Sequence, residues 1–176
     1  MKNVMEDKIR ILPLTREIAE VIVRGEREQG WENASMNKYE LRFRDAAEGR
    51  AVALAALFNG EPAGYINVYP DSPRGGFGGM GLPEIVDFGV LEKFRGRGIG
   101  SRLMDEAEKI AASYAGTVYP GVGLHSGYGS AQRMYLKHGC LPDGKGVYYY
   151  GVPAIPYSDV TNDDELALYL SKSLKK

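Results

Sequence analysis

The chain has 176 residues, a hydrophobic content of 44%, a charged content of 26% and a formal net charge of −1. These values are ordinary for a soluble globular protein, and the length predicts a single domain over residues 1–176. Because there is no basic surplus, the composition gives no reason to expect a nucleic-acid partner.

The single cysteine suits a reducing compartment, and the hydropathy of the chain gives no sign of a membrane segment. The only cysteine, Cys140, excludes an internal disulfide. No apolar run is long enough to cross a membrane, and the charged amino terminus lacks the apolar centre of a signal peptide. No Cys/His cluster indicates a metal site. We therefore expect a cytoplasmic protein with no membrane partner and no metal.

Apolar periodicity and turn signals predict the elements of the first half. They are a strand over residues 9–12, a helix after Thr15, a helix over 38–48, and strands over 51–58 and 65–69. Thr15 is a suitable N-cap, and Ile18, Val21 and Ile22 follow it at helical spacing. Asn59-Gly60 is a hairpin-turn signal, whereas the Pro/Gly-rich residues 70–81 predict an irregular loop.

The second half continues the alternation of strands and helices. We predict a strand over 85–90, a helix from Ile99, a strand within 118–125 placed at 122–125, a loop over 127–130, a helix over 131–138, a strand end at 140–141, a long segment over 144–158, and a last strand over 166–170. In the helix from Ile99, one apolar stripe is expected to face the core. It contains Ile99, Leu103, Ala107, Ile110 and Tyr114. Pattern alone predicts a mixed α/β domain.

The junction between the strand over 85–90 and the helix from Ile99 predicts a phosphate site. The first backbone N–H groups of a helix have no partner inside the helix, and the helix dipole favours negative charge there. Glycines let the backbone approach an anion closely. Arg95 and Arg97 add charge-assisted hydrogen bonds.

The glycine spacing narrows the choice of ligand. A Walker loop needs Gly-Lys-Ser/Thr and a dinucleotide fingerprint needs G-x-G-x-x-G, and neither is present. What remains is Arg-x-x-Gly-x-Gly, formed by Arg95, Gly98 and Gly100 after a strand that ends at Val90. This pattern resembles the acyl-CoA pyrophosphate loop of the GNAT N-acetyltransferases. The alternative is a plain strand–helix turn with solvated arginines, but one glycine would suffice for that.

The resemblance covers nearly the whole chain, because the order of the elements also agrees with the GNAT family. It implies an α+β fold, a three-layer αβα sandwich around a mixed, mostly antiparallel sheet, whose fourth and fifth strands splay apart to admit acyl-CoA. Acetyl-CoA would be the co-substrate, and its pantetheine arm would pair with the backbone near Phe88 and Val90. The residues of the pyrophosphate turn would be Arg95, Gly96, Arg97, Gly98, Ile99, Gly100 and Ser101.

A second stretch, Ser130–Cys140, resembles another motif of the family, an alanine followed by a tyrosine and a glycine. By this match Tyr135 is the general acid that protonates the departing CoA thiolate. The alternative is a helix tyrosine packed in the core.

The same stretch departs from the family pattern at two positions. Tyr128 stands where the family has asparagine, and Cys140 where it has phenylalanine. The first departure puts a pantetheine contact from that position in doubt. Ser126 or Ser130 is the candidate replacement.

Two carboxylates near the strand over 85–90 are candidates for the general base that deprotonates the amine. In a regular strand Glu84 shares a face with Val90, while Asp87 lies on the other face. Some family members keep a base near the start of this strand, so we place Glu84 first and Asp87 second. A β-bulge would exchange their faces, and a base acting through water would need neither. An exposed carboxylate at the strand start is an equally good interpretation.

Other polar and aromatic residues carry weaker signals. His125 is a candidate proton relay, but a loop histidine bonded to the backbone is the better interpretation. Trp31 and Tyr148–Tyr150 are candidates for lining an acceptor pocket, although single aromatics more often belong to the core. No serine or cysteine nucleophile motif is present.

Together these observations predict an N-acetyltransferase that moves an acetyl group from acetyl-CoA to a primary amine by direct attack. The acceptor stays open between a small amine, an antibiotic, a peptide amino terminus and a protein lysine. The alternative is a non-catalytic acyl-CoA-binding or sensing domain of the same fold. Whether the chain forms a homodimer also stays open.

Overall fold

The computed structural model describes residues 8–174, which form two compact units. The first unit comprises residues 8–67 and 87–106, and the second comprises residues 68–86 and 107–174. Strands β3 (Glu61–Tyr69) and β4 (Glu84–Val90) and helix α3 (Ile99–Ala112) begin in one unit and end in the other.

The strands of the first unit follow the hydrogen-bonded order β1-β2-β3-β4. Strand β1 (Ile9–Pro13) pairs antiparallel with β2 (Val52–Phe58), with Ile9 opposite Phe58. The turn from β2 to β3 has left-handed backbone at Asn59 (φ 50°) and Gly60 (φ 87°). This is the conformation that a tight hairpin requires, so the predicted turn is confirmed.

The helices of the first unit are α1 (Arg16–Glu28) and α2 (Asn37–Ala47). Thr15 caps α1 as predicted, because its hydroxyl accepts a hydrogen bond from the N–H of Ile18. The predicted apolar stripe is wrong at Val21, whose side chain is 38% exposed. Successive residues lie about 100° apart around a helix, so Val21 falls off the buried stripe of Ala19, Ile22 and Glu26.

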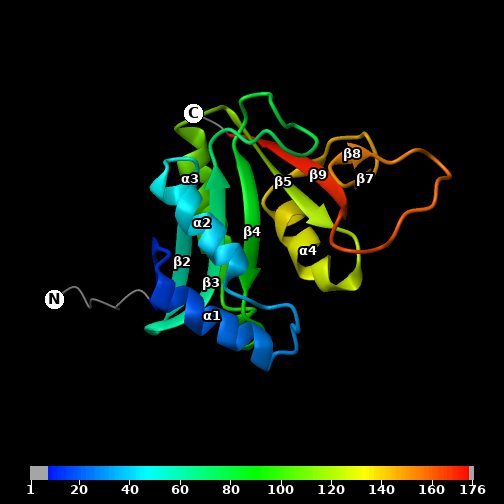
Figure 1. Cartoon of the computed structure of the whole chain (residues 1–176). Helices are drawn as coiled ribbons and strands as arrows, with labels where there is room; N and C mark the ends of the chain where they lie inside the picture. The colour runs from blue at the N-terminus through cyan, green and yellow to red at the C-terminus, as the bar shows by residue number, and fades with distance from the viewer. Residues whose placement is uncertain (1–7, 175–176) are drawn as a thin grey trace. The chain divides into compact units, whose positions relative to one another are not determined.

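Neighbouring residues of β3 face helices on opposite sides. The hydroxyl of Tyr65 donates to Glu26 of α1. A Cβ built on Gly64, the preceding residue, would lie 3.3 Å from a methyl carbon of Leu103 in α3. Figure 1 shows α1 and α2 in front of β2 and β3. The first unit therefore has the αβα layering that the family resemblance implied.

The strands of the second unit follow the order β4-β5-β9-β7-β8, with β6 also paired to β9. The start of β4 is parallel to β5 (Thr117–Gly123), and β9 (Leu166–Ser173) runs antiparallel to β5 (Figure 1). The strands of this unit also include three short ones, β6 (Leu141–Pro142), β7 (Tyr148–Tyr149) and β8 (Val152–Pro153). In all, the described residues form nine strands, mostly antiparallel, and four α-helices, so the predicted α+β class is confirmed.

The predicted strand within 118–125 is confirmed, but its placement at 122–125 is wrong, because β5 covers Thr117–Gly123 and ends before His125. His125 instead caps a short 3₁₀ helix, η2 (Ser126–Tyr128), by accepting a hydrogen bond from the N–H of Gly127. Helix α4 (Gly129–Lys137) follows directly and begins before Ala131, the predicted start. This side-chain cap replaces the loop that the glycines at 127 and 129 suggested.

Two further expectations need correction. Tyr114 is 56% exposed and lies beyond the end of α3, whose buried residues include Met104 and Ala111. The segment 144–158 carries a hairpin of β7 and β8, which the sequence did not predict because each strand is only two residues long.

No helix within residues 8–174 is long and apolar enough to cross a membrane.

The close approach of β3 and β4 at Gly64 generates a first prediction. A Cβ there would lie 2.6 Å from the carbonyl oxygen of Gly89. We expect Gly64→Ala to lower the free energy of unfolding by about 1–3 kcal/mol, the usual cost of overpacking. Gly116→Ala is the matched control, since a Cβ at Gly116 meets no atom within 4 Å. Urea unfolding measures the free energy of unfolding of both variants, and equal values for the two would contradict the prediction.

Candidate active site

The turn that follows β4 has the backbone expected of an anion-binding loop. A short 3₁₀ helix, η1 (Glu92–Phe94), comes first, and residues 95–98 are then exposed. Gly96 (φ 73°) and Gly98 (φ 82°) are left-handed, a conformation that costs other residues free energy. The N–H of Arg102 donates to the carbonyl of Gly98 at 3.1 Å and so closes the first turn of α3.

Neighbouring groups hold both arginines of the turn. Arg95 Nε donates to the carbonyl of Val90 at 3.3 Å, and its guanidinium pairs with Glu92 at 3.5 Å. The guanidinium of Arg97 lies over the ring of Phe58, 5.1 Å from the centroid. Since both side chains belong to exposed residues, two positive charges lie beside the amide groups at the start of α3.

Strand β4 is not regular, and this removes the basis for the predicted face of Glu84. Asp87 has left-handed backbone (φ 51°), which interrupts the simple alternation of side chains along the strand. Its carboxylate accepts a hydrogen bond from Arg42 Nε of α2 at 2.6 Å. The spacing between Glu84 and Val90 along the strand therefore no longer shows on which face of the sheet Glu84 lies.

Beyond Asp87 the alternation is regular. Asp87 reaches α2, and a Cβ on Gly89 would meet the ring of Tyr65 at 3.0 Å, so both positions face the side of α1 and α2. Val90 faces the other side, since its Cγ2 lies 3.2 Å from a Cβ built on Gly64. Asp87 thus lies on the face opposite Val90, as the sequence predicted, but on an irregular backbone.

Glu84 lies in the second unit among tyrosines. It is opposite Tyr119 in the parallel register between β4 and β5. Burial raises the pKa of Tyr119, and the charge of Glu84 and its hydrogen bond raise it further. Burial and then the charge of Glu84 also raise the pKa of Tyr169. Glu84 is therefore a carboxylate beside two neutral phenols.

Helix α4 holds the predicted acid and the predicted serine. Tyr135 is 4% exposed, and its carbonyl accepts a hydrogen bond from the N–H of Cys140 at 3.0 Å. Ser130 is exposed in the first turn of the helix. The side chain of Gln132 donates to the carbonyl of Gly123 at 2.8 Å, which links α4 to the end of β5.

His125 is bonded to backbone, as the sequence analysis preferred. Because the Gly127 N–H donates to Nδ1 at 3.1 Å, the proton of the ring must be on Nε2, which donates to Asp164 at 2.9 Å. The hydroxyl of Tyr128 also donates to Asp164 at 2.9 Å, and the hydrogen bonds from His125 and Tyr128 lower the pKa of Asp164. Both ring nitrogens of His125 are therefore hydrogen-bonded.

The predicted residues divide between the units. The first holds Asp87, Phe88, Val90 and the turn over 95–101, and the second holds Glu84, Ser130 and Tyr135. The aromatic residues suggested for an acceptor pocket do not share one environment, since Tyr148 is buried whereas Trp31 and Tyr150 are exposed. Within residues 8–174 no group of three or more His, Cys, Asp or Glu residues is arranged for a metal ion.

The first unit also contains a buried ionic cluster that was not predicted from the sequence. Glu26 of α1 is fully buried and accepts hydrogen bonds from Lys38, Tyr39 and Tyr65. An acidic residue in the apolar stripe of Ala19 and Ile22 was the signal that could have revealed it.

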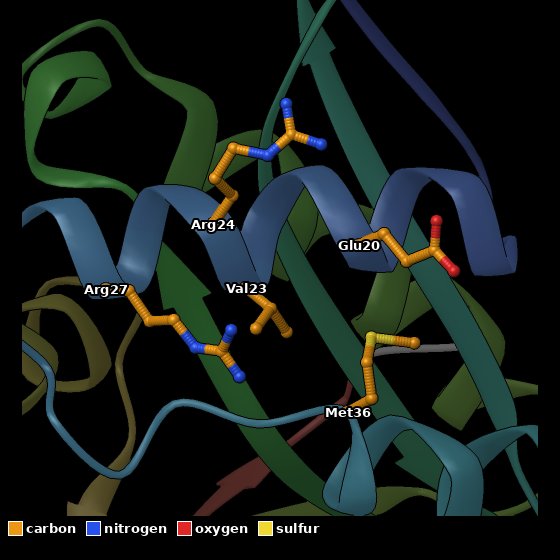
Figure 2. A pocket seen from close by; sticks show the side chains of 5 residues that line it. All are labelled: Glu20, Val23, Arg24, Arg27 and Met36. Atoms are coloured by element: carbon orange, nitrogen blue, oxygen red, sulfur yellow. The ribbon is translucent and has the colours of Figure 1, made fainter.

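A small pocket of about 250 Å³ lies on the same helix. Its lining residues are Glu20, Val23, Arg24, Arg27 and Met36. Figure 2 shows Val23, Arg27 and Met36 on one side of α1 and the Arg24 guanidinium on the other. Arg27 is bonded to the carbonyl of Ala34 at 2.9 Å. The pocket contains none of the predicted site residues.

Comparison with known proteins places these features in one family. A model described as the acetyltransferase (GNAT) family matches residues 16–140, which include the turn and the Tyr135 motif. No protein of curated function matches the sequence at a significant level.

Solved structures agree in fold at low sequence identity. Ard1 from Thermoplasma volcanium has a TM-score of 0.69 at 19% identity, over 96% of this chain and 99% of its own. An aminoglycoside 6'-N-acetyltransferase complexed with coenzyme A has a TM-score of 0.66 at 20% identity, over 95% and 98%. YncA, a putative acetyltransferase from Salmonella typhimurium with its cofactor acetyl-CoA, has a TM-score of 0.67 at 12% identity, over 97% and 96%.

The left-handed backbone at Asp87 generates a second prediction. At an ordinary strand position glycine is less stable than alanine by roughly 0.5–1 kcal/mol. At Asp87 we expect the reverse, with Asp87→Gly more stable than Asp87→Ala by about 1 kcal/mol, because only glycine relieves the strain. Both variants lose the pair with Arg42, so the difference between their free energies of unfolding in urea reports the backbone conformation alone. Val86→Gly and Val86→Ala are the control pair. If Asp87→Ala is more stable than Asp87→Gly, the left-handed backbone at Asp87 is contradicted.

Proposed function

Because the chain belongs to the GNAT family of acetyltransferases, we propose that it transfers an acetyl group from acetyl-CoA to a primary amine by direct attack. The observation that carries the proposal is the turn over residues 95–98, with its left-handed glycines at the start of α3. The acetyl-CoA bound to the structurally similar YncA supports the choice of donor.

In this proposal the pyrophosphate of acetyl-CoA binds at the turn. The amide groups at the start of α3 donate to the phosphate oxygens, and Arg95 and Arg97 add positive charge. Gly96 and Gly98 have no side chain in this turn, and a Cβ built on either would meet no atom within 4 Å. The pantetheine arm is assigned to the backbone at Phe88 and Val90, and Ser130 is a second contact to it.

The chemistry requires one new bond and one broken bond. The neutral amine attacks the thioester carbon, the C–N bond forms, and the C–S bond breaks as the thiolate leaves. Tyr135 is assigned as the acid that gives the thiolate its proton. A covalent intermediate on cysteine is disfavoured, because burial raises the pKa of Cys140 to about 11 and the thiol stays protonated at neutral pH.

The base that takes the proton of the amine is assigned to Glu84 first and Asp87 second. The irregular backbone at Asp87 removes the face argument, so the order rests on the partners of the two carboxylates. Asp87 is paired with Arg42 at 2.6 Å, and it would have to give up this partner to meet an amine. Glu84 lies beside phenols that are neutral at physiological pH.

A turnover screen with acetyl-CoA against a panel of amines tests the activity. The panel contains an aminoglycoside, a polyamine, peptides with free amino termini and a lysine peptide. We expect release of CoA with a mass gain of one acetyl group on at least one amine. Acetyl-CoA binding without transfer to any class of amine would instead favour the non-catalytic acyl-CoA-binding domain.

The pyrophosphate turn generates a third prediction. Gly98→Glu places a negative side chain in the anion site and is expected to abolish acetyl-CoA binding. Gly144→Glu is the matched control, because Gly144 is also left-handed (φ 77°) and surrounded by open space. Calorimetric titration of both folded variants measures the affinity. An unchanged Kd for Gly98→Glu would remove the turn from the cofactor site.

The role of Tyr135 generates a fourth prediction. If its hydroxyl protonates the thiolate, Tyr135→Phe should lower kcat by about 10²–10⁴-fold and leave the Kd of acetyl-CoA nearly unchanged. Tyr114→Phe removes a hydroxyl from an exposed tyrosine and serves as the control. Near wild-type turnover of Tyr135→Phe would show that this buried tyrosine is only part of the core.

A further inference from the structure

The fully buried carboxylate of Glu26 is the centre of a polar cluster that the proposed chemistry does not use. Its Oε1 accepts hydrogen bonds from the hydroxyls of Tyr39 at 3.1 Å and Tyr65 at 3.0 Å, and from Lys38 Nζ at 3.0 Å. Burying a charge is costly unless it is paired and hydrogen-bonded. Helices α1 and α2 and strand β3 all contribute to this pairing.

The ammonium group of Lys38 lies in a cage. It is 4.9 Å from the ring centroid of Tyr39 and 4.8 Å from that of Tyr65, both within the range of cation–π attraction. Its Nζ also donates to the hydroxyl of Tyr65 at 2.6 Å. Burial raises the pKa of both tyrosines, so their rings stay neutral. The carboxylate of Glu26, the hydroxyl of Tyr65 and the ring of Tyr39 together surround this primary ammonium.

The carboxylate of Glu26 can also accept further hydrogen bonds. Its second oxygen, Oε2, is buried and has no hydrogen-bond partner among residues 8–174. Buried carboxylate oxygens are normally hydrogen-bonded, so Oε2 has room for a donor that the described residues do not supply. This second observation is independent of the Lys38 contacts.

The cluster lies against the strand to which the acyl donor is assigned. The ring of Tyr65 packs on Gly89, where a Cβ would lie 3.0–3.1 Å from its atoms. Gly89 stands between Phe88 and Val90, the residues assigned to the pantetheine arm. The side chain of Lys38 is 35% exposed, whereas that of Glu26 is fully buried, so Lys38 lies on the solvent side of the carboxylate.

We propose that Glu26, Tyr39 and Tyr65 form an ammonium-binding site for the amine acceptor, and that Lys38 occupies this site in the absence of substrate. The inference rests on the proposed function for the identity of the ligand. Lys38 enters the cage through an unbranched methylene chain, so the fitting ligand is a primary ammonium on an unbranched alkyl chain. The competing explanation is that Lys38 is only the counter-ion of Glu26.

A binding test without acetyl-CoA separates these explanations. Lys38→Ala removes the resident ammonium and is expected to lower the Tm, because Glu26 loses its charged partner. Methylammonium chloride should then raise the Tm of Lys38→Ala by about 2 °C or more above the effect of equimolar sodium chloride, since a ligand that binds only the folded state stabilises it. Tetramethylammonium, which has no N–H donor, should not.

The control is the double variant Glu26→Gln/Lys38→Ala, which has the same opening but no carboxylate. It should show no specific response to methylammonium. An equal response of the single and double variants, or no response of the single variant, overturns the ammonium site. If Lys38→Ala does not fold, Lys38→Ser, which also removes the stem of the side chain, undergoes the same titration.

The acceptor role has its own measurement. With an amine that the protein acetylates, Lys38→Ala should lower the KM of the amine at least threefold, and Glu26→Gln should raise it at least tenfold, with the Kd of acetyl-CoA unchanged in both. An unchanged KM in Glu26→Gln overturns the acceptor role. A protein that acetylates no amine fails the proposed function, whereas the methylammonium titration still decides whether the cage binds ammonium.

Discussion

The pairing of one buried carboxylate determines how the first unit is built. Glu26 joins α1 to α2 through Lys38 and Tyr39, and to β3 through Tyr65. Removing a partner from such a cluster leaves an uncompensated buried charge, which typically costs about 3–5 kcal/mol. Apolar side chains of similar volume would hold these elements together at no such risk. The cost is easier to understand if the cluster has a chemical task beside β4, where Tyr65 packs on Gly89.

Strand β4 has two neighbouring features with different roles. In the proposed function its end offers backbone groups and a glycine turn to acetyl-CoA, while the carboxylate of Asp87 reaches Arg42 of α2. The left-handed backbone of Asp87 interrupts the alternation toward Glu84, whereas the residues from Asp87 to Val90 stay regular. Strain of this kind persists only where the surroundings hold it in place, and the 2.6 Å contact with Arg42 is such a constraint.

The sequence predicted those features that depend on local chemistry. The Thr15 cap, the Asn59-Gly60 turn and the start of α3 after a glycine turn were all confirmed, because each is determined by a few neighbouring residues. The irregularity at Asp87 could not be predicted, since it depends on Arg42, which is distant in the sequence. The hairpin of β7 and β8 was missed because two-residue strands have no detectable period. The roles of Tyr135, Glu84 and the turn residues stay predictions, because they concern groups that act on a ligand.

The two carboxylates proposed as the base and the carboxylate proposed to bind the ammonium each have a partner of their own. Asp87 faces the guanidinium of Arg42, Glu84 faces the phenol of Tyr119, and Glu26 faces the ammonium of Lys38. An incoming ammonium must therefore exchange with a resident group, and the cost of that exchange depends on how firmly the group is held. The Arg42 side chain is 15% exposed and planar, so it has little freedom to leave, whereas the Lys38 side chain is 35% exposed on a flexible stem. Lys38 can move its ammonium group into solvent while its backbone stays in place, so it is the partner most readily exchanged. The carboxylate that it then releases is Glu26, whose Oε2 has no hydrogen-bond partner within residues 8–174.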